Sequence, residues 1–391
     1  MATPMRRGRP AAAWAYVAVA AIFLASLAQY HHGRTGFTSL IWFGDQFEDG
    51  LLPAVAAAPH FVHVRSSGYD GQFYAQLAVD PLLRDPRLGR ALDAAPYRAR
   101  RIFFSWTAWA FGLGRPAWIL QVYALQNVAA WLLLAWVLLR WFPPAAPRSL
   151  LPWIGCLFGV GMIMSVRFAL TEGPGLLVLA LAVAAVERGR PWLASGLMAV
   201  VGLGRETNFV AGGLLLDRLP GSWRSAAGLA ARGLAALLPF AAWFLYVRWV
   251  FPPLAASDAA NFAAPFSGYL QKWLVTIGQL QASGWWGSWA RFNLFALVSV
   301  TVQAVYLLSR REWSSAWWRA GAAYCLLLPF LSYPVWEGDP GAVMRVALPM
   351  SVAFNVLVAG SRWFWPLAVA GNLTVLHGIH MINVPWVATL L

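Results

Sequence analysis

The chain has 391 residues, of which 60% are hydrophobic and only 11% are charged. A soluble domain carries roughly 25% charged residues because its surface faces water, so this composition excludes a soluble enzyme and a disordered tail. The chain contains only two cysteines, Cys156 and Cys325, which excludes a disulfide scaffold. The sequence therefore predicts an all-α polytopic membrane protein, with residues 1–391 forming a single integral membrane domain.

The net charge of +14 comes almost entirely from arginine, because Lys272 is the only lysine. In a soluble protein such an excess would suggest nucleic-acid binding. In a chain this apolar, basic residues are expected to mark the cytoplasmic loops that orient a membrane protein. The expected partner is therefore membrane lipid and not nucleic acid.

The first apolar run spans residues 11–28 and follows Arg6, Arg7 and Arg9. Small residues near its end are compatible with a cleaved signal peptide. The run is, however, longer than the usual apolar region of a signal peptide, which has roughly 7–15 residues. We therefore predict a retained first span with the N-terminus in the cytoplasm.

A long polar segment follows, and we predict that residues 31–116 form an outer loop with amphipathic or re-entrant helices. It holds seven of the fifteen acidic residues, which are Asp45, Glu48, Asp49, Asp70, Asp80, Asp85 and Asp93. The apolar stretch Ile102–Leu113 is too short to cross about 30 Å of hydrocarbon at 1.5 Å per residue. This stretch is expected to be a re-entrant or interfacial helix.

Ten further apolar segments bring the predicted number of spans to about eleven. They are Trp118–Leu139, Leu150–Phe168, Gly173–Val186, Pro191–Gly204, Phe209–Leu216, Leu229–Trp249, Phe292–Ser309, Trp317–Tyr333, Val343–Ala359 and Trp363–Met381. The fourth and fifth of these are short, so they form either two arms of a hairpin turned at residues 205–207 or one helix. The hairpin places Arg310, Arg311, Arg319 and Arg362 in the cytoplasm with the other basic loops, and the positive-inside rule favours it.

The first loop contains the sequence Gly-Tyr-Asp-Gly-Gln-Phe-Tyr at residues 68–74. Residues 71–79 read as a short amphipathic helix that ends before Pro81, because proline disfavours helix in the preceding residue. Asp70 lies at the start of this helix, where an aspartate can simply be an N-cap. Alternatively, Asp70, flanked by Tyr69, Gln72 and Tyr74, accepts a proton from a substrate hydroxyl as a general base.

Several arginines on the same predicted face are candidates for phosphate binding, because a guanidinium group pairs with two phosphate oxygens. They are Arg98, Arg101, Arg205 and Arg345, with Glu206 beside Arg205. Asp45, Glu172 and Glu337 are supporting candidates. Simpler roles remain open: Arg98 and Arg101 could anchor the chain at the interface, Arg205 could pair with a glutamate, and Arg345 could pair with Glu337.

Metal binding is a weaker expectation. Asp45, Glu48 and Asp49 could hold a divalent cation through oxygen ligands, or they could belong to a solvated loop. His377 and His380 share a helical face, and His377 could support the site, although packing explains two histidines equally well. No motif for ATP, for a dinucleotide, for a zinc protease or for a serine hydrolase occurs, so no cofactor beyond a candidate divalent cation is expected.

These motifs resemble the GT-C superfamily of membrane glycosyltransferases. Residues 69–74 with Leu77-Ala78 are similar to the Trp-Asp-Gly loop of GPI-mannosyltransferase-like members. Residues 68–74, the Tyr-Arg-x-Arg-Arg stretch at 97–101 and the Arg-Glu-Thr turn at 205–207 look closer still to a group of uncharacterised bacterial membrane proteins. Many superfamily members carry an acidic pair in the first loop. Here Glu48-Asp49 is such a pair, but it does not lie at the main motif, where Asp70 has no acidic neighbour.

The resemblance implies an inverting glycosyltransferase with a polyprenyl-phosphate- or diphosphate-linked sugar donor. It would lie in a bacterial inner membrane with its site on the periplasmic face, Asp70 would be the base, and the arginines would bind the donor phosphate. The alternatives are a transporter or flippase of a lipid-linked or anionic solute, which would also place charges among broken helices, and a non-catalytic assembly subunit.

Overall fold

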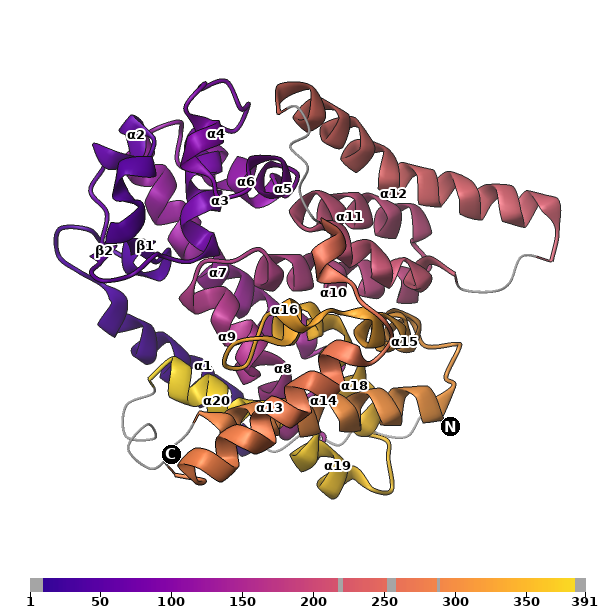
Figure 1. Cartoon of the computed structure of the whole chain (residues 1–391). Helices are drawn as coiled ribbons and strands as arrows, with labels where there is room; N and C mark the ends of the chain where they lie inside the picture. Colours follow the sequence, from indigo (N-terminus) through magenta and orange to yellow (C-terminus); the bar gives the residue numbers. More distant parts are fainter. Residues whose placement is uncertain (1–9, 217–220, 252–257, 287–288, 384–391) are drawn as a thin grey trace.

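A computed structural model describes residues 10–216, 221–251, 258–286 and 289–383 of the chain. Within these residues the secondary structure is almost entirely helical, which confirms the predicted all-α class (Figure 1). The strands of this part are β1 (Phe43–Gly44) and β2 (Val62–His63), which pair in parallel in the first loop. Arg6, Arg7 and Arg9, which led to the predicted orientation of the first span, lie outside the described residues.

Four described helices are long and apolar enough to cross a membrane: α1 (Pro10–Leu27), α7 (Pro116–Leu138), α12 (Trp223–Val250) and α14 (Ala290–Arg310). A fifth candidate is the pair α8 (Leu150–Phe158) and α9 (Val160–Arg167), which is bent by 45°. These helices are typical of a membrane protein. Four or five spans are thus supported by length and composition, and the predicted number of about eleven is not confirmed.

The other predicted spans form shorter helical segments. They are α10 (Glu172–Glu187), α11 (Pro191–Gly204), η4 (Glu206–Leu215), α15 (Ala316–Leu327), η6 (Leu328–Phe330), α16 (Tyr333–Trp336), α17 (Val343–Val346), α18 (Leu348–Val358), α19 (Phe364–Ala370) and α20 (Thr374–Met381). A span needs about 20 residues, so each of these is short. Pro329 and Pro349 lie in the first turns of η6 and α18. Proline is tolerated there because the N–H that it lacks would have no partner within the helix.

The chain turns at Arg205, as the hairpin prediction requires. Arg205 has an extended backbone between α11 and η4, and the two segments pack against each other. A Cβ at Gly202 would lie only 2.0 Å from the ring of Phe209, so the hairpin depends on a glycine there. The single-helix alternative is therefore wrong.

The first loop forms a packed helical layer and not an extended chain. After η1 (Ala28–Tyr30), its helices are η2 (Thr38–Leu40), η3 (Asp45–Gly50), α2 (Pro53–Ala56), α3 (Asp70–Val79), α4 (Leu88–Ala91), α5 (Ala95–Ala99) and α6 (Phe103–Phe111). Helix α3 packs against α6 and α7. It ends at Val79, as the prediction from Pro81 requires. Helix α6 is short, in agreement with the prediction that residues 102–113 do not cross a membrane.

Two elements, η5 (Asp258–Asn261) and α13 (Ser267–Ser283), were not predicted. Helix α13 packs against α14 and α16, and exposes Leu270, Leu274 and Ile277. A search for long apolar runs misses it because polar residues alternate with these side chains. Helix α12 exposes more apolar surface, including Leu245 and Trp249 at 67% and 78%. Large apolar side chains in such positions are expected to face lipid.

Candidate functional site

Asp70 is the first residue of α3, and its carboxylate contacts two arginines from distant parts of the chain. Arg98 Nη2 donates to Asp70 Oδ1 at 2.8 Å, and Arg345 Nη1 lies 3.3 Å from Oδ2. Tyr69, and not Asp70, occupies the N-cap position of the helix. The Asp70 side chain remains 27% exposed, so it is held by two cations and is still accessible.

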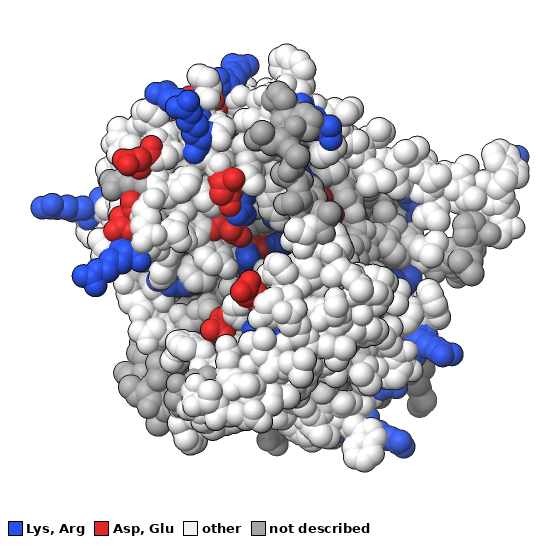
Figure 2. All heavy atoms as spheres, in the orientation of Figure 1, with Lys and Arg blue, Asp and Glu red and all other residues white. Residues whose placement is uncertain are grey.

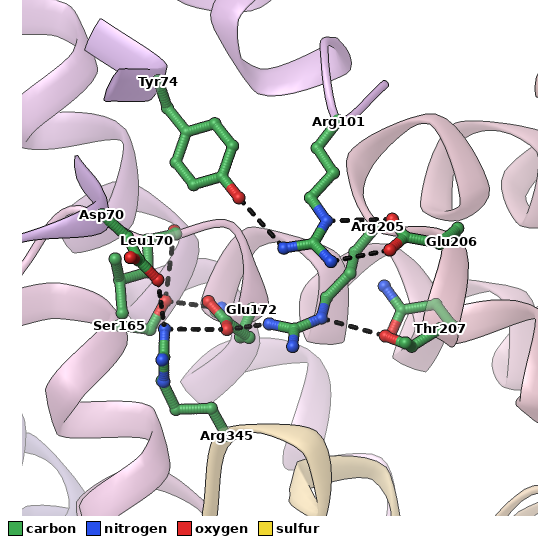
Figure 3. A network of polar contacts seen from close by, with 12 residues as sticks. Asp70, Tyr74, Arg101, Ser165, Leu170, Glu172, Arg205, Glu206, Thr207 and Arg345 are labelled. Atoms are coloured by element: carbon green, nitrogen blue, oxygen red, sulfur yellow. Dashed lines mark hydrogen bonds and ion pairs between the residues drawn. The ribbon is translucent and has the colours of Figure 1, made fainter. Parts of the chain in front are cut away.

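Glu172 links Arg345 to a further arginine, Arg205. Its Oε1 accepts from Arg345 Nη1 at 3.2 Å and pairs with Arg205 Nη1 (Figure 3). The Glu172 side chain is only 5% exposed, so both partners compensate a buried charge. The pairing of Arg205 with a glutamate was among the alternatives above. The suggested pairing of Arg345 with Glu337 is wrong, because Arg345 pairs with Asp70 and Glu172.

Arg101 and Glu206 form a bidentate ion pair at the other side of the cluster. The two distances are 2.9 Å from Nε to Oε2 and 2.6 Å from Nη2 to Oε1. Arg101 also donates to the hydroxyl groups of Tyr74 and Tyr97, at 3.1 and 2.6 Å. Arg100 reaches the same Glu206 carboxylate at 3.1 Å. Three of the residues named from the sequence, Tyr74, Arg101 and Glu206, are thus in direct contact.

Arg98 is fixed from two sides. Its Nε and Nη2 donate to both carboxylate oxygens of Asp93 at 2.8 and 2.7 Å, and Nη2 also contacts Asp70. Two parallel bonds hold a planar guanidinium group in one orientation. Arg98 therefore presents a fixed positive charge to Asp70.

Two close backbone approaches bring these segments together. A Cβ at Gly71 would lie 2.1 Å from the carbonyl oxygen of Phe168, so the start of α3 packs directly on the segment between α9 and α10. A Cβ at Gly161 would lie 2.2 Å from the carbonyl oxygen of Met344, next to Arg345. Tyr69 stacks on Phe168 with ring centroids 4.4 Å apart. These contacts place Asp70, Glu172 and Arg345 at one point.

The cluster opens into a cavity of about 370 Å³. Its charged lining consists of Arg100, Arg101, Arg205, Arg345, Asp70 and Glu206. Another wall is apolar and includes Leu327, Leu331 and Val335. Charged side chains gather around a hollow at the centre of the face in Figure 2, whereas the lower part of that face is mostly uncharged. The cavity therefore has one side lined by charged residues, mostly arginines, and another side lined by apolar residues.

The arginines set the protonation of both lining carboxylates. Burial alone would raise the pKa of Asp70, but the charges of Arg98 and Arg345 outweigh burial and hold this pKa well below its usual value. Burial likewise opposes ionisation of Glu206, yet Arg101 and its neighbours lower the pKa of Glu206 to about 2. Both carboxylates are ionised at neutral pH, and the four lining arginines leave the cavity with an excess of positive charge.

Several residues named from the sequence lie elsewhere. Gln72 braces the first loop, because its side chain bonds to Gly44 N and to Ser67 O, at 3.2 and 2.9 Å. His377 is buried and stacks on Phe292 with ring centroids 4.4 Å apart, so packing accounts for it. Glu337 is exposed on the segment between α16 and α17 and does not line the cavity.

The first-loop acids give no metal cluster in the part of the chain that the structure describes. Asp45 accepts from the backbone N–H groups of Arg65 and Ser66, at 2.8 and 3.0 Å. This contact closes the loop between β1 and β2. No group of three or more metal-binding side chains occurs among the described residues; the side chain of Glu48 lies outside them.

Four contributors were not named as site residues from the sequence, and one of them is Arg100, which lines the cavity and contacts Glu206. Asp93 orients Arg98 through its carboxylate. The Tyr97 hydroxyl accepts a hydrogen bond from Arg101, and Thr207 Oγ1 accepts one from Arg205 Nε at 2.9 Å. Tyr97 and Thr207 belong to the Tyr-Arg-x-Arg-Arg and Arg-Glu-Thr motifs, and that membership was a usable signal. Asp93 carried none beyond its position five residues before Arg98.

Comparison of the chain with protein-family models, with curated proteins and with solved structures finds no match.

Proposed function

We propose that the protein is a membrane glycosyltransferase that moves a sugar from a polyprenyl-phosphate or polyprenyl-diphosphate donor to an acceptor hydroxyl, with inversion at the anomeric carbon. The observation that carries this proposal is the cavity itself, in which the carboxylates of Asp70 and Glu206, four arginines and an apolar wall meet. A donor of this class has a matching arrangement, because an anionic phosphate joins the sugar to an apolar chain.

The donor phosphate would bind to Arg345 and Arg205. Arg345 donates through Nη1 to both of its carboxylate partners, and its buried Nε has no hydrogen-bond partner in the described part of the chain. Arg205 uses Nε and Nη1 for Thr207 and Glu172. Both guanidinium groups therefore keep N–H donors for phosphate oxygens, and they would stabilise the charge that develops on the leaving phosphate.

Asp70 would act as the general base. The acceptor oxygen forms a bond to the anomeric carbon while the bond from that carbon to the phosphate oxygen breaks. The electron pair of the broken bond goes to the phosphate, and the proton of the hydroxyl passes to Asp70. No nucleotide or metal is needed for this balance.

The two ion pairs of Asp70 make it a weak base before the donor binds, because its pKa is depressed. A phosphate that takes over Arg345 would remove one of these pairs and add a negative charge nearby. Both changes raise the pKa of Asp70. Donor binding would thus make the base effective only when a leaving group is present.

The proposed chemistry determines where the cavity should lie relative to the membrane. A lipid-linked donor requires a site at membrane level, and we propose that the cavity faces the periplasmic side of a bacterial inner membrane, with the chain crossing it about eleven times. Residues of α15, α16 and α17, which are too short to span singly, line the cavity on one side. Charged residues at membrane depth are costly, so their presence there indicates function.

The test is sugar transfer in proteoliposomes. The purified protein is given radiolabelled polyprenyl-phosphate sugars and a membrane extract as acceptor, and binding of sugar-free long-chain polyprenyl phosphate is measured separately. Transfer that requires Asp70 supports the proposal. Uptake of intact donor into the lumen without transfer indicates a flippase, and neither transfer nor binding of polyprenyl phosphate indicates an assembly subunit; both results contradict the proposal.

A further inference from the structure

A second and larger cavity, of about 800 Å³, lies between the last turns of α14 and the segment that leads into α19. Its apolar lining includes Val302, Val305, Trp363 and Leu367, and two arginines, Arg310 and Arg362, line it as well. None of these residues lines the cavity of Asp70. It is therefore a separate feature of the molecule.

We call this second cavity the groove, and its polar end is positively charged. Arg310 Nε donates to Tyr306 Oη at 3.0 Å, and its Glu312 contact is a long 4.0 Å between partly exposed side chains. Arg362 lies over the ring of Trp363, and the described residues give it no salt bridge. Arg148 adds a third guanidinium group nearby, because its Nη1 donates to the carbonyl oxygen of Ser361 at 3.2 Å. The single carboxylate of Glu312, at 4.0 Å, does not neutralise the three guanidinium groups.

The length of the groove matches one leaflet of a bilayer. It follows α14 from Thr301 to Arg310, which is about 14 Å at 1.5 Å per residue. Half of a hydrocarbon core of about 30 Å has nearly the same thickness. Trp363 is 60% exposed at the charged end, as interfacial tryptophans often are. Acyl chains can therefore lie along α14 while a headgroup reaches the arginines.

The groove lies at the opposite end of α14 from the cavity of Asp70. Asn293, in the first turn of α14, bonds to Asp339 of the segment that precedes Arg345. Arg310 follows Asn293 by 17 positions, so the two ends of the helix are about 25 Å apart. If the first cavity opens to one leaflet, the groove opens to the other, and Arg310 and Arg362 were assigned to the cytoplasmic side from the sequence.

We propose that this groove binds an anionic phospholipid of the cytoplasmic leaflet, with the phosphate on Arg310 and Arg362 and an acyl chain against Val302 and Val305. Basic pockets between membrane helices on the cytoplasmic side select anionic headgroups, since each arginine near the surface favours them. The two arginines select the charge of the lipid, and the apolar wall holds its chain.

The test compares two lipids on the full-length protein. Phosphatidylglycerol or phosphatidylcholine is titrated into the detergent-purified protein, and bound lipid is counted by native mass spectrometry. We expect phosphatidylglycerol to bind more tightly, and the double substitution R310Q/R362Q to weaken it by about tenfold or more without affecting phosphatidylcholine. The matched control R188Q/R224Q removes two exposed arginines that do not line the groove, and it should keep the preference.

A second variant tests the apolar wall without changing charge. Val305 is 63% exposed and lines the groove, so Val305→Trp should fill it and weaken both lipids. Equal binding of the two lipids by the unaltered protein overturns the proposal, as does a preference that survives in R310Q/R362Q. Because these variants leave the cavity of Asp70 intact, the outcome does not depend on whether the chain transfers sugar.

Discussion

Arg345 contacts both Asp70 and Glu172 through the same nitrogen, Nη1, at 3.3 and 3.2 Å, although 275 and 173 positions separate it from them in the chain (Figure 3). One guanidinium group therefore joins the first loop, the start of α10 and the start of α17. Any ligand that draws Arg345 away from Asp70 changes the charge around that carboxylate.

Asp70→Asn is expected to reduce sugar transfer by about 10²- to 10⁴-fold, the usual range for loss of a general base. Asparagine keeps the shape of the side chain and can still accept a hydrogen bond from Arg98, but it is not a base. The initial rate of transfer checks the prediction, and the thermal midpoint serves as the control for folding. A well-folded Asp70→Asn protein with full activity would show that Asp70 only organises the arginines.

Arg345→Lys should weaken donor binding more than Asp70→Asn does. Lysine keeps the charge but loses the planar fork that pairs with two oxygens. Binding of polyprenyl phosphate and the rate at saturating donor are measured separately. Arg87→Lys is the matched control, because Arg87 is exposed, pairs with Asp85 and does not line the cavity. Unchanged donor affinity in Arg345→Lys would place the phosphate elsewhere.

Glu172→Gln should destabilise the fold by about 3–5 kcal/mol, because it leaves the guanidinium group of Arg205 without its buried counter-charge and leaves Arg345 with Asp70 alone. Glu172 is only 5% exposed, so water cannot replace it. Chemical unfolding in detergent micelles measures the loss. Glu187→Gln, which removes an ion pair with the half-exposed Arg140, should have a much smaller effect. Equal losses in the two variants would argue against a charge-compensating role for Glu172.

The ion pairs of Asp70 and Glu206 also predict a dependence of stability on pH. The pKa of each carboxyl group is lower in the folded than in the unfolded protein, and that of Glu206 falls to about 2. Their contribution to stability is therefore complete above the ordinary carboxyl pKa of about 4 and is lost as the pH falls towards the folded values. Glu206→Gln should flatten the decrease in thermal midpoint between about pH 5 and pH 2. An unchanged profile would contradict the role of the Arg101–Glu206 pair.

The proposed orientation can be tested by cysteine labelling. Ser67 and Ser309 are both exposed, one beside the Asp70 motif and one at the charged end of α14. Single cysteines at these positions should react with a membrane-impermeant maleimide from opposite sides. The two native cysteines are buried and give a low background. Labelling of both positions from the same side would exclude the eleven-span arrangement.

The sequence alone predicted the helical class, long apolar helices typical of a membrane protein, the helix that begins beside Asp70, and the residue types of the site. These follow from local properties: apolar runs, a proline after residue 80 and arginines beside aromatic residues. The turn at residues 205–207 was also predicted, from the distribution of basic residues, and the helix does break at Arg205.

Only the tertiary structure decided which charges meet. Glu172 pairs with Arg205 and Arg345, whereas Glu337 and His377 lie elsewhere, because backbone contacts at Gly71 and Gly161 determine the placement of α3 and α17. The same is true of α13, whose alternating polar residues conceal a helix that packs on α14. The sequence shows which side chains carry a charge that is costly to bury. Packing between distant segments determines which partner of opposite charge lies beside each of them.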